Sequence, residues 1–382
     1  MIKLHGKIID APAELIGNKI LTVTTNARLP DALKRGKAFL GSESVSPGFD
    51  AQIIFESQAN VSTGSTSSAV LANELGYLGE GDVIRLDFEN RKAHTLFRAS
   101  SEHNTLLLTE RCNHYCLMCS QPPKDVDDSW LLTEAFEVIS RIPTSTKNIG
   151  FSGGEPTLYG NSFIELIQFT KNQLPNTALD VLTNGRKFAN IEFTKQFASI
   201  DHPDCYLGIP LYSEDPAIHD YVVQANCAYD ETIRGILNLK RFQQKVEIRV
   251  VLHRHTVPRL HHLAEFICRN LTFVDHVALM GLEMMGFTRA NLDDLWIDPY
   301  EYKDQLSVAL GIFNAYGLRT SVYNHQLCVI NKDAEQNYVK SISDWKNGYV
   351  AECDRCQRRH ECGGFFASSI EHRFSRYMKA FQ

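Results

Sequence analysis

The stretch NTLLLTERCNHYCLMCSQPP, residues 104–123, decides the fold. Its first six residues form a short apolar run that predicts a buried strand, and Cys112, Cys116 and Cys119 follow this strand at once. From residue 104 onward, short apolar runs alternate with longer amphipathic ones, which is the pattern of repeated βα units. The cysteines therefore lie on the loop at the carboxyl end of a predicted parallel strand, where βα barrels carry their chemistry.

Six parallel strands are expected in this part of the chain, each linked to the next by helical sequence. The expected strands are 104–109, 148–152, 179–183, 205–211, 246–252 and 276–282. The expected helices are 132–142, 162–172, 191–197, 230–242, 260–270 and 300–316. The predicted fold class is thus α/β, with a partial (β/α)6 TIM-like barrel. Periodicity alone leaves an open doubly wound sheet as the alternative.

Residues 1–100 differ from the rest because their apolar residues alternate with polar ones, as in AQIIFES (51–57) and DVIRLDF (82–88). This pattern predicts a small β-rich N-terminal domain. The partial barrel is expected over residues 101–325, and a cysteine-rich extension over residues 326–382.

Composition excludes several classes of protein. The chain has 382 residues, of which 43% are hydrophobic and 22% charged, as in ordinary globular proteins. A net charge of −6 gives no broad basic field for nucleic acid or an anionic membrane. No apolar run reaches the ~18 residues of a membrane span, and Asp10 and Glu14 interrupt the apolar stretches at the start. We expect a cytoplasmic protein, in which clustered thiols indicate metal binding or catalysis.

The spacing C-x3-C-x2-C lets three thiolates surround one inorganic centre. A structural zinc site needs four closed ligands. A [4Fe-4S] cluster is usually held by four cysteines, so three ligands leave one iron without a protein thiolate. An open metal position is typical of catalytic sites, and Cys112, Cys116 and Cys119 are therefore the candidate catalytic ligands.

These residues resemble the radical S-adenosylmethionine (SAM) superfamily, whose hallmark is this spacing after the first strand of a partial barrel. The resemblance implies that the open iron binds SAM and that reductive cleavage gives a 5′-deoxyadenosyl radical. One departure is Met118, where the superfamily usually has an aromatic residue before the third cysteine. Methionine fills the same kind of apolar contact.

Three further motifs follow the predicted strands. Gly153, Gly154 and Glu155 in FSGGEPTL match the superfamily's motif for the amino group of SAM. Glycine permits close backbone approach, and a carboxylate accepts hydrogen bonds from an ammonium group. Thr183 and Asn184 in LTNG are expected to face the site, although Asn-Gly is equally a turn signal.

The segment LYSEDPAIHDYVVQ contains Ser213, which matches a SAM-contacting position in peptide-modifying relatives. Those relatives often carry an arginine shortly afterwards, whereas this chain has valine and glutamine there. The partner of the SAM carboxylate is therefore open. His219 and Asp220 in this segment are expected to begin a helix.

Alternation along 246–252 places Glu247, Arg249, Val251 and the following His253 on one face, which we expect to line the barrel interior. Arg249 and His253 lie nearest its open end and are candidate cofactor-binding residues. A buried structural pair of Arg249 with Glu247 is the alternative.

A second cluster comprises Cys353, Cys356 and Cys362, with Cys328 upstream as a plausible fourth ligand. Four cysteines are enough for a structural zinc. The spacing C-x2-C-x5-C resembles the auxiliary-cluster extensions called SPASM or twitch domains, which implies a second [4Fe-4S] cluster. Cys205, Cys227 and Cys268 show no such spacing and are expected to fill the core.

Several longer stretches, including GEGDVIRLD, IRVVLHRHTVPRL, SISDWKN and CGGFFASS, resemble the His-Xaa-Ser system radical SAM maturases of the HxsC type. This resemblance implies a bacterial peptide-maturation system with a substrate peptide containing His-Xaa-Ser repeats. It also implies a second radical SAM protein as partner and a reductant such as flavodoxin or ferredoxin. Two alternatives stay open, a radical SAM enzyme for a small molecule and a non-enzymatic iron–sulfur or zinc protein.

Overall fold

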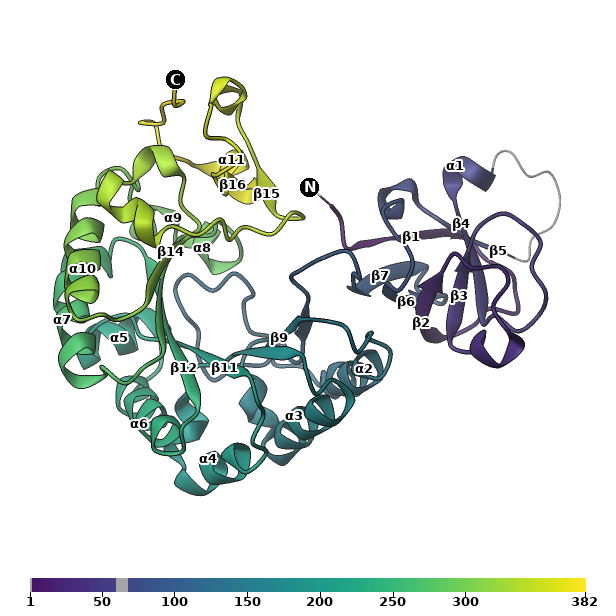
Figure 1. Ribbon diagram of the computed structural model, residues 1–382, viewed down its shortest axis with the longest axis horizontal. Coiled ribbons are helices and arrows are strands. Elements are labelled where there is room, and N and C mark those ends of the chain that lie inside the picture. The colour runs from purple at the N-terminus through teal and green to yellow at the C-terminus, as the bar shows by residue number, and fades with distance from the viewer. Residues whose placement is uncertain (1, 60–67) are drawn as a thin grey trace.

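The computed structural model describes residues 2–59 and 68–382. It has two lobes, a small β-barrel formed by the first part of the chain and a larger α/β lobe formed by the rest (Figure 1). Within these described residues, no helix has both the length and the apolar character that crossing a membrane requires.

The small lobe is a closed barrel in the order β1-β5-β4-β3-β2-β6-β7. Strands β2 to β5 are mutually parallel, and the other pairings are antiparallel. The strands are β1 (His5–Asp10), β2 (Asn18–Thr24), β3 (Lys37–Leu40), β4 (Ala51–Phe55), β5 (Ser68–Leu71), β6 (Val83–Asp87) and β7 (Lys92–Phe97). Alternate apolar side chains fill the interior, so the prediction of a β-rich N-terminal region is confirmed.

The large lobe contains a sheet of seven parallel strands in sequential order, from β8 at one edge to β14 at the other. The strands are β8 (Thr105–Leu107), β9 (Asn148–Ser152), β10 (Ala178–Leu182), β11 (Cys205–Pro210), β12 (Lys245–Leu252), β13 (His276–Gly281) and β14 (Thr320–Tyr323). The predicted partial barrel is confirmed, with one strand more than expected. Strand β14 has only four residues, which is too short for a recognisable apolar pattern.

Helices cover the outer face of this curved sheet (Figure 1). They are α2 (Ser129–Ile139), α3 (Asn161–Gln173), α4 (Ile191–Ala198), α5 (Pro216–Val223), α6 (Ala228–Arg241), α7 (Leu260–Asn270) and α10 (Lys303–Ala315). The short helices α8 (Phe287–Ala290) and α9 (Leu292–Leu295) lie instead against residues 118 and 119. Asp215 begins α5 by accepting a hydrogen bond from the Ala217 amide, with Pro216 at the first helical position. The remaining short α-helices are α1 (Glu56–Ala59) in the small lobe and α11 (Ala367–His372) near the C-terminus.

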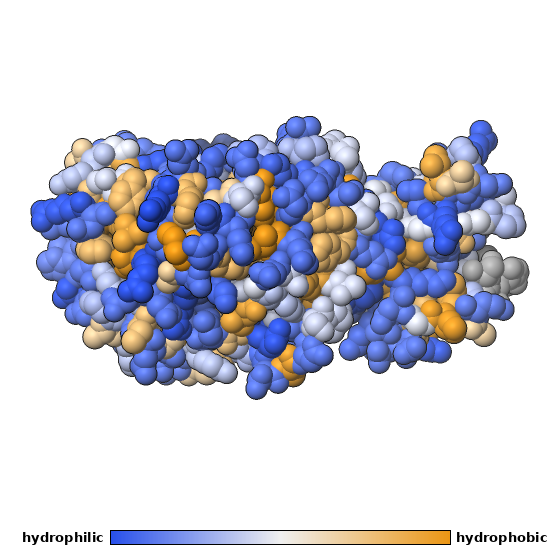
Figure 2. All heavy atoms as spheres, turned by 90° about the horizontal axis from the view of Figure 1, so that it is seen from below, coloured by the Kyte–Doolittle hydropathy of each residue, from blue (hydrophilic) through white to orange (hydrophobic). Residues whose placement is uncertain are grey.

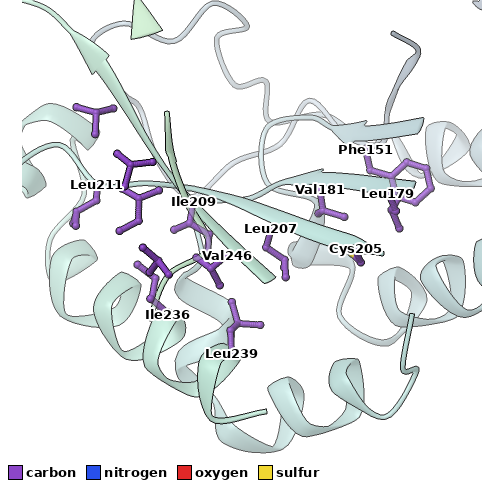
Figure 3. Packing of buried hydrophobic residues seen from close by; sticks show 14 of the residues in the cluster. Phe151, Leu179, Val181, Cys205, Leu207, Ile209, Leu211, Ile236, Leu239 and Val246 are labelled. Carbon is purple, nitrogen blue, oxygen red and sulfur yellow. The ribbon is translucent and has the colours of Figure 1, made fainter. Parts of the chain in front are cut away.

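The core lies between the sheet and these helices. In β12, Val246, Ile248, Val250 and Leu252 are fully buried, while the alternate residues are partly exposed on the inner face. Figure 3 shows side chains of β11 and β12 packed above those of α6, with side chains of β9 and β10 farther along the same face of the sheet. The predicted alternation of this strand is therefore confirmed. Cys205 and Cys268 are buried as expected, but Cys227 is exposed beside the start of α6, so the prediction that it fills the core is wrong.

The C-terminal extension lies beside the β14 edge of the barrel (Figure 1). It contains the two-stranded sheet of β15 (Asn347–Gly348) and β16 (Phe365–Phe366). The chain's 3-10 helices are η1 (Asp31–Leu33), η2 (Asn73–Leu75), η3 (Pro156–Tyr159), η4 (Arg186–Ala189), η5 (Val257–Arg259), η6 (Leu327–Val329), η7 (Lys332–Asn337) and η8 (Ala351–Arg355). Figure 2 shows that the face seen from below is mostly hydrophilic, with hydrophobic side chains in scattered patches.

Candidate active site

The three cysteines of the loop after β8 line one cavity of about 760 Å³. Residues at the carboxyl ends of β9, β10, β12 and β13 line the same cavity, including Gly153, Thr183, Val251 and Gly281. The structure thus brings Cys112, Cys116 and Cys119 to the end of the barrel where βα-barrel enzymes hold their active sites.

Backbone hydrogen bonds fix this cysteine loop, residues 108–128, although it has no regular secondary structure. The amides of Tyr115 and Leu117 donate to the carbonyls of Val223 and Val222 at the end of α5, both at 3.0 Å. On the opposite side, the amide of Phe287 in α8 donates to the Cys119 carbonyl at 2.8 Å. These contacts hold the cysteine loop between α5 and α8.

Burial raises the pKa of the Cys112 thiol to about 12, and it also raises the pKa values of Cys116 and Cys119. The proximity of the other thiols adds to this effect at Cys112 and Cys116, because neighbouring thiolates repel one another. A cationic centre among the three sulfurs removes both penalties, and its binding releases protons.

Gly153 and Gly154 hold the end of β9 against the cysteine loop. A β-carbon on Gly153 would lie 2.6 Å from the carbonyl oxygen of Thr109, and one on Gly154 would collide with the carbonyl of Arg111. The Gly154 amide donates to Thr109 at 2.8 Å, and the Glu155 amide donates to Arg111 at 2.8 Å. The end of β9 can approach the cysteine loop this closely only with glycine at both positions, and both glycines line the cavity.

The Glu155 side chain is 1% exposed and does not line the cavity. Its Oε1 accepts hydrogen bonds from the amide and hydroxyl of Thr157 and from the hydroxyl of Thr183, and its Oε2 accepts from the Asn184 amide at 2.5 Å. Burial raises the pKa of Glu155, and these donors act in the opposite direction. Glu155 therefore positions the end of β10, and its expected role as acceptor for an ammonium group stays a prediction.

Thr183 and Asn184 both line the cavity, at the position where the sequence placed them. The Asn184 side-chain amide donates to Oδ1 of Asn113 in the cysteine loop at 2.6 Å. The carboxylate of Glu155 and the cysteine loop are thus joined through one asparagine.

Arg249 lines the cavity. Its guanidinium pairs with Oε1 of Glu247 at 2.5 Å, and Oε2 of Glu247 lies 2.7 Å from Nδ1 of His276, whose Nε2 lies 2.9 Å from the Ser321 hydroxyl. Burial alone raises the pKa of Glu247, but the hydrogen bond from His276 and the charge of Arg249 outweigh burial and lower it. Gly208 makes room for this arginine, since a β-carbon there would lie 2.8 Å from Cδ of Arg249.

Two other predicted cofactor-binding residues lie outside the cavity. Ser213 is 1% exposed, accepts a hydrogen bond from the Asp215 amide at 3.0 Å and donates to Glu214. His253 is fully buried beyond the end of β12, and burial lowers its pKa to about 3. Their roles toward a cofactor stay predictions.

Sequence reasoning missed the outer walls of the cavity. Strand β7 of the small lobe contributes residues 95–97, followed by Arg98, and the C-terminal extension contributes Ser341, Ile342, Ser343, Trp345 and Lys346. Lys346 pairs with Glu283 at 3.0 Å, and Arg98 pairs with Asp344 at 3.2 Å. Arg98 and Asp344 are 246 positions apart in the sequence, and the residues around each give no indication that the two side chains meet.

The four C-terminal cysteines line a second, smaller cavity of about 30 Å³. The structure places Cys328, on η6, beside the group formed by Cys353, Cys356 and Cys362. Burial raises the pKa values of Cys328 and Cys353, and the nearby Cys362 adds to this. Within residues 2–59 and 68–382, no group of three or more His, Cys, Asp or Glu side chains is arranged around a single ion. In a [4Fe-4S] cluster, each cysteine binds a different iron atom, so its four cysteine sulfurs lie farther apart than the ligands of a single ion.

The chain has a partial βα barrel with three thiols lining a cavity at the carboxyl ends of its strands. This is the end at which βα-barrel enzymes place their active sites. Residues 106–267 match the family model for the radical SAM superfamily. Over these residues, which are less than half of the chain, the barrel is similar to the radical SAM superfamily.

Solved structures share this fold. The structure described as "Native anSMEcpe with bound AdoMet" matches with a TM-score of 0.51 and 13% identity, over 72% of this chain and 92% of that chain. "Native anSMEcpe with bound AdoMet and Cp18Cys peptide" matches with a TM-score of 0.50 and 13% identity, over 72% of this chain and 91% of that chain. Comparison with curated proteins gives no match.

Proposed function

We propose that this chain is a radical SAM enzyme that cleaves S-adenosylmethionine reductively and modifies a ribosomally made peptide of the His-Xaa-Ser repeat type. The observation that carries the proposal is the position of Cys112, Cys116 and Cys119, which line one cavity at the carboxyl ends of seven parallel strands. Structures of the same fold have AdoMet bound, by their descriptions.

The residues fit a [4Fe-4S] cluster with one open iron. The donor set is three cysteine thiols from one loop, and the cavity beside them has room for a cofactor and part of a substrate. Cys112, Cys116 and Cys119 would hold three irons. When bound, the cluster supplies an electron from a reductant such as flavodoxin or ferredoxin, which splits a carbon–sulfur bond of SAM and gives a 5′-deoxyadenosyl radical that abstracts a substrate hydrogen.

The chain's own residues orient the cofactor. Glu155 holds the backbone amide of Asn184, and Asn184 in turn contacts the cysteine loop. Arg249 has guanidinium N–H groups beyond its contact with Glu247, and these are suited to a carboxylate of SAM or of the substrate. Because Glu247 is itself bonded to His276, the arginine is held in one orientation before a ligand arrives.

We assign Cys328, Cys353, Cys356 and Cys362 to a second metal centre, an auxiliary [4Fe-4S] cluster. The convergence of all four thiols on one cavity supports a closed four-cysteine site. Zinc is the alternative occupant, because four thiolates also suit it. Metal analysis distinguishes the two, with roughly eight irons per chain for two cubanes and about four for a zinc-containing second site.

A peptide substrate is supported by the walls of the cavity. Three parts of the chain meet there, namely the small lobe, the barrel and the C-terminal extension. A structure of the same fold has a peptide bound together with AdoMet, by its description. The His-Xaa-Ser repeats, the second radical SAM partner protein and the bacterial maturation system rest on the sequence resemblance.

Two experiments test the proposal. Anaerobically purified protein with reductant and SAM is expected to give 5′-deoxyadenosine, and Cys116→Ala should abolish this product. Cys227→Ala, at an exposed cysteine outside both cavities, is the matched control. Co-expression with the short open reading frames beside the gene should change a peptide's mass, and a small loss of hydrogen mass indicates a crosslink. Normal turnover by Cys116→Ala would exclude the cysteine loop as the site.

A small-molecule substrate is the second candidate, because a cavity of about 760 Å³ lies within the usual ~300–1,000 Å³ of small-ligand sites. Formation of 5′-deoxyadenosine without any change in the co-expressed peptides would favour it.

A further inference from the structure

Strand β8 is an edge strand that faces the active-site cavity. It pairs with β9 on one side only, and it is the last strand of the seven-stranded sheet. Thr105 and Leu107 of this strand line the cavity, whereas the side chain of Leu106 packs into the core on the opposite face. Thr105 is exposed and Leu107 is partly buried.

The hydrogen-bonding register shows which backbone groups of β8 are free. The Gly150 amide donates to the carbonyl of Asn104, and the Leu108 amide donates to the carbonyl of Ser152, both at 2.8 Å. In a parallel pair, residues alternate between facing the neighbouring strand and facing away from it. Residues 104, 106 and 108 thus face β9, and the backbone groups of Thr105 and Leu107 face the open edge. No other described residue hydrogen-bonds to these groups.

The opposite edge of the sheet is protected by the chain itself. Val322 in β14 pairs with Tyr338 through an isolated parallel bridge, and the Val339 amide donates to the Val322 carbonyl at 3.0 Å. Proteins generally cover exposed strand edges, because an open edge pairs with other chains. Strand β8 lacks such a cover in the described part of the chain.

The number of strands in the sheet is consistent with space for one more strand beside β8. A complete βα barrel closes with eight strands, and this sheet has seven. The missing position lies between β8 and β14, at the seam from which the cavity extends toward the C-terminal extension.

We propose that an extended segment of the substrate peptide adds to the free edge of β8 as an extra strand inside the active-site cavity. The occupant is a polypeptide backbone, since two N–H donors and two C=O acceptors, placed two residues apart along one line, match the repeat of an extended chain. The ion pair of Lys346 with Glu283 lines the same cavity and gives it a polar wall for the peptide's side chains. This inference rests on the proposed peptide substrate.

Pairing with β8 also explains how a peptide of variable sequence reaches the reactive centre. The main chain supplies the affinity, so few side chains need to be recognised. Alternate side chains of the added strand point into the cavity, as Thr105 and Leu107 do. Four residues separate Leu107 from Cys112, so the paired segment lies beside the start of the cysteine loop.

Hydrogen exchange of the intact chain tests the inference directly. The probe is a synthetic peptide with three His-Ala-Ser repeats, added to anaerobically purified protein with SAM. We expect the amides of Thr105 and Leu107 to exchange about tenfold more slowly with the peptide bound, because they become hydrogen-bonded. Amides of the central strand β10 are the internal control and should not change.

A pair of variants isolates the backbone contribution. Thr105→Pro removes the outward N–H and is tolerated by an edge strand, whereas Thr105→Val keeps the amide. We expect the proline variant to bind the peptide about tenfold more weakly and the valine variant to bind within about twofold of the original chain. Circular dichroism establishes that each variant is folded, and if Thr105→Pro is not, hydrogen exchange of the unmodified chain decides.

The outcomes separate this inference from the proposed function. Peptide binding without slower exchange at β8, or with equal affinity in both folded variants, overturns the inference alone. A chain that forms no 5′-deoxyadenosine and binds no His-Ala-Ser peptide overturns both. Formation of 5′-deoxyadenosine without peptide binding overturns the inference and leaves radical SAM chemistry standing.

Discussion

Replacing Glu155 with glutamine gives the sharpest test of how the site is held together. The substitution keeps the size of the side chain but replaces one acceptor oxygen with an NH₂ donor. If Oε1 keeps its three donors from Thr157 and Thr183, the new amide faces the N–H of Asn184. Two donors then meet in a fully buried position.

The cost follows from this geometry. A buried donor left without an acceptor costs about 1–3 kcal/mol. The opposite orientation of the amide is worse, because three donors then lose their acceptor. For a barrel of this size, about 2 kcal/mol lowers the melting temperature by roughly 4–8 °C. The Asn184 backbone also loses its anchor, so we expect weaker SAM binding, by about fivefold.

Thermal unfolding by circular dichroism and calorimetric titration with SAM measure the two effects. The matched control is Glu165→Gln, at an exposed position on α3, which should change the melting temperature by less than about 1 °C. A Glu155→Gln variant that melts and binds SAM like the original chain would refute the positioning role of this carboxylate.

Three further predictions concern Gly154 compared with Gly311, the carboxylate of Glu247, and the C-terminal cysteines. Gly154→Ala should destabilise the chain by about 1–3 kcal/mol and lower its iron content, while Gly311→Ala, in open space on α10, should stabilise it by about 0.5–1 kcal/mol in denaturant unfolding. The pKa of Glu247 is lowered in the folded state, so its carboxylate stabilises the fold fully above its ordinary pKa of 4.5. This stabilisation is lost as the pH falls through the lower pKa of the folded state. In Glu247→Gln, the free energy of unfolding should therefore fall less steeply at acid pH. Cys328→Ala should reduce the iron content from about eight to about four per chain, whereas Cys227→Ala should leave it unchanged, by iron assay.

Much of this architecture is predictable because its signals are local. The alternation along β12 is confirmed residue by residue, and the interval from the first strand to the cysteine loop is short. The cysteine spacing brings three thiols together whatever the rest of the chain does, since the loop between Cys112 and Cys119 has only six residues.

The parts that sequence reasoning missed depend on contacts between distant residues. The Glu155 carboxylate accepts a hydrogen bond from the Asn184 amide, which follows β10, and the motif FSGGEPTL gives no sign of this contact. The pairing of Arg98 with Asp344 joins the small lobe to the C-terminal extension, and neither residue lies in a distinctive motif. Packing of whole elements decides such contacts, so local patterns do not reveal them.

The weakness of that last contact matters for access to the cavity. Arg98 is 9% exposed, but Asp344 is 55% exposed, so water screens the pair and it contributes at most about 1 kcal/mol. The small lobe is itself a closed barrel with its own core, and separating it from the extension leaves that core intact. Breaking this ion pair is therefore inexpensive compared with unfolding either part. For the peptide substrate proposed above, breaking this contact would let an internal segment reach β8 without threading a chain end through the cavity.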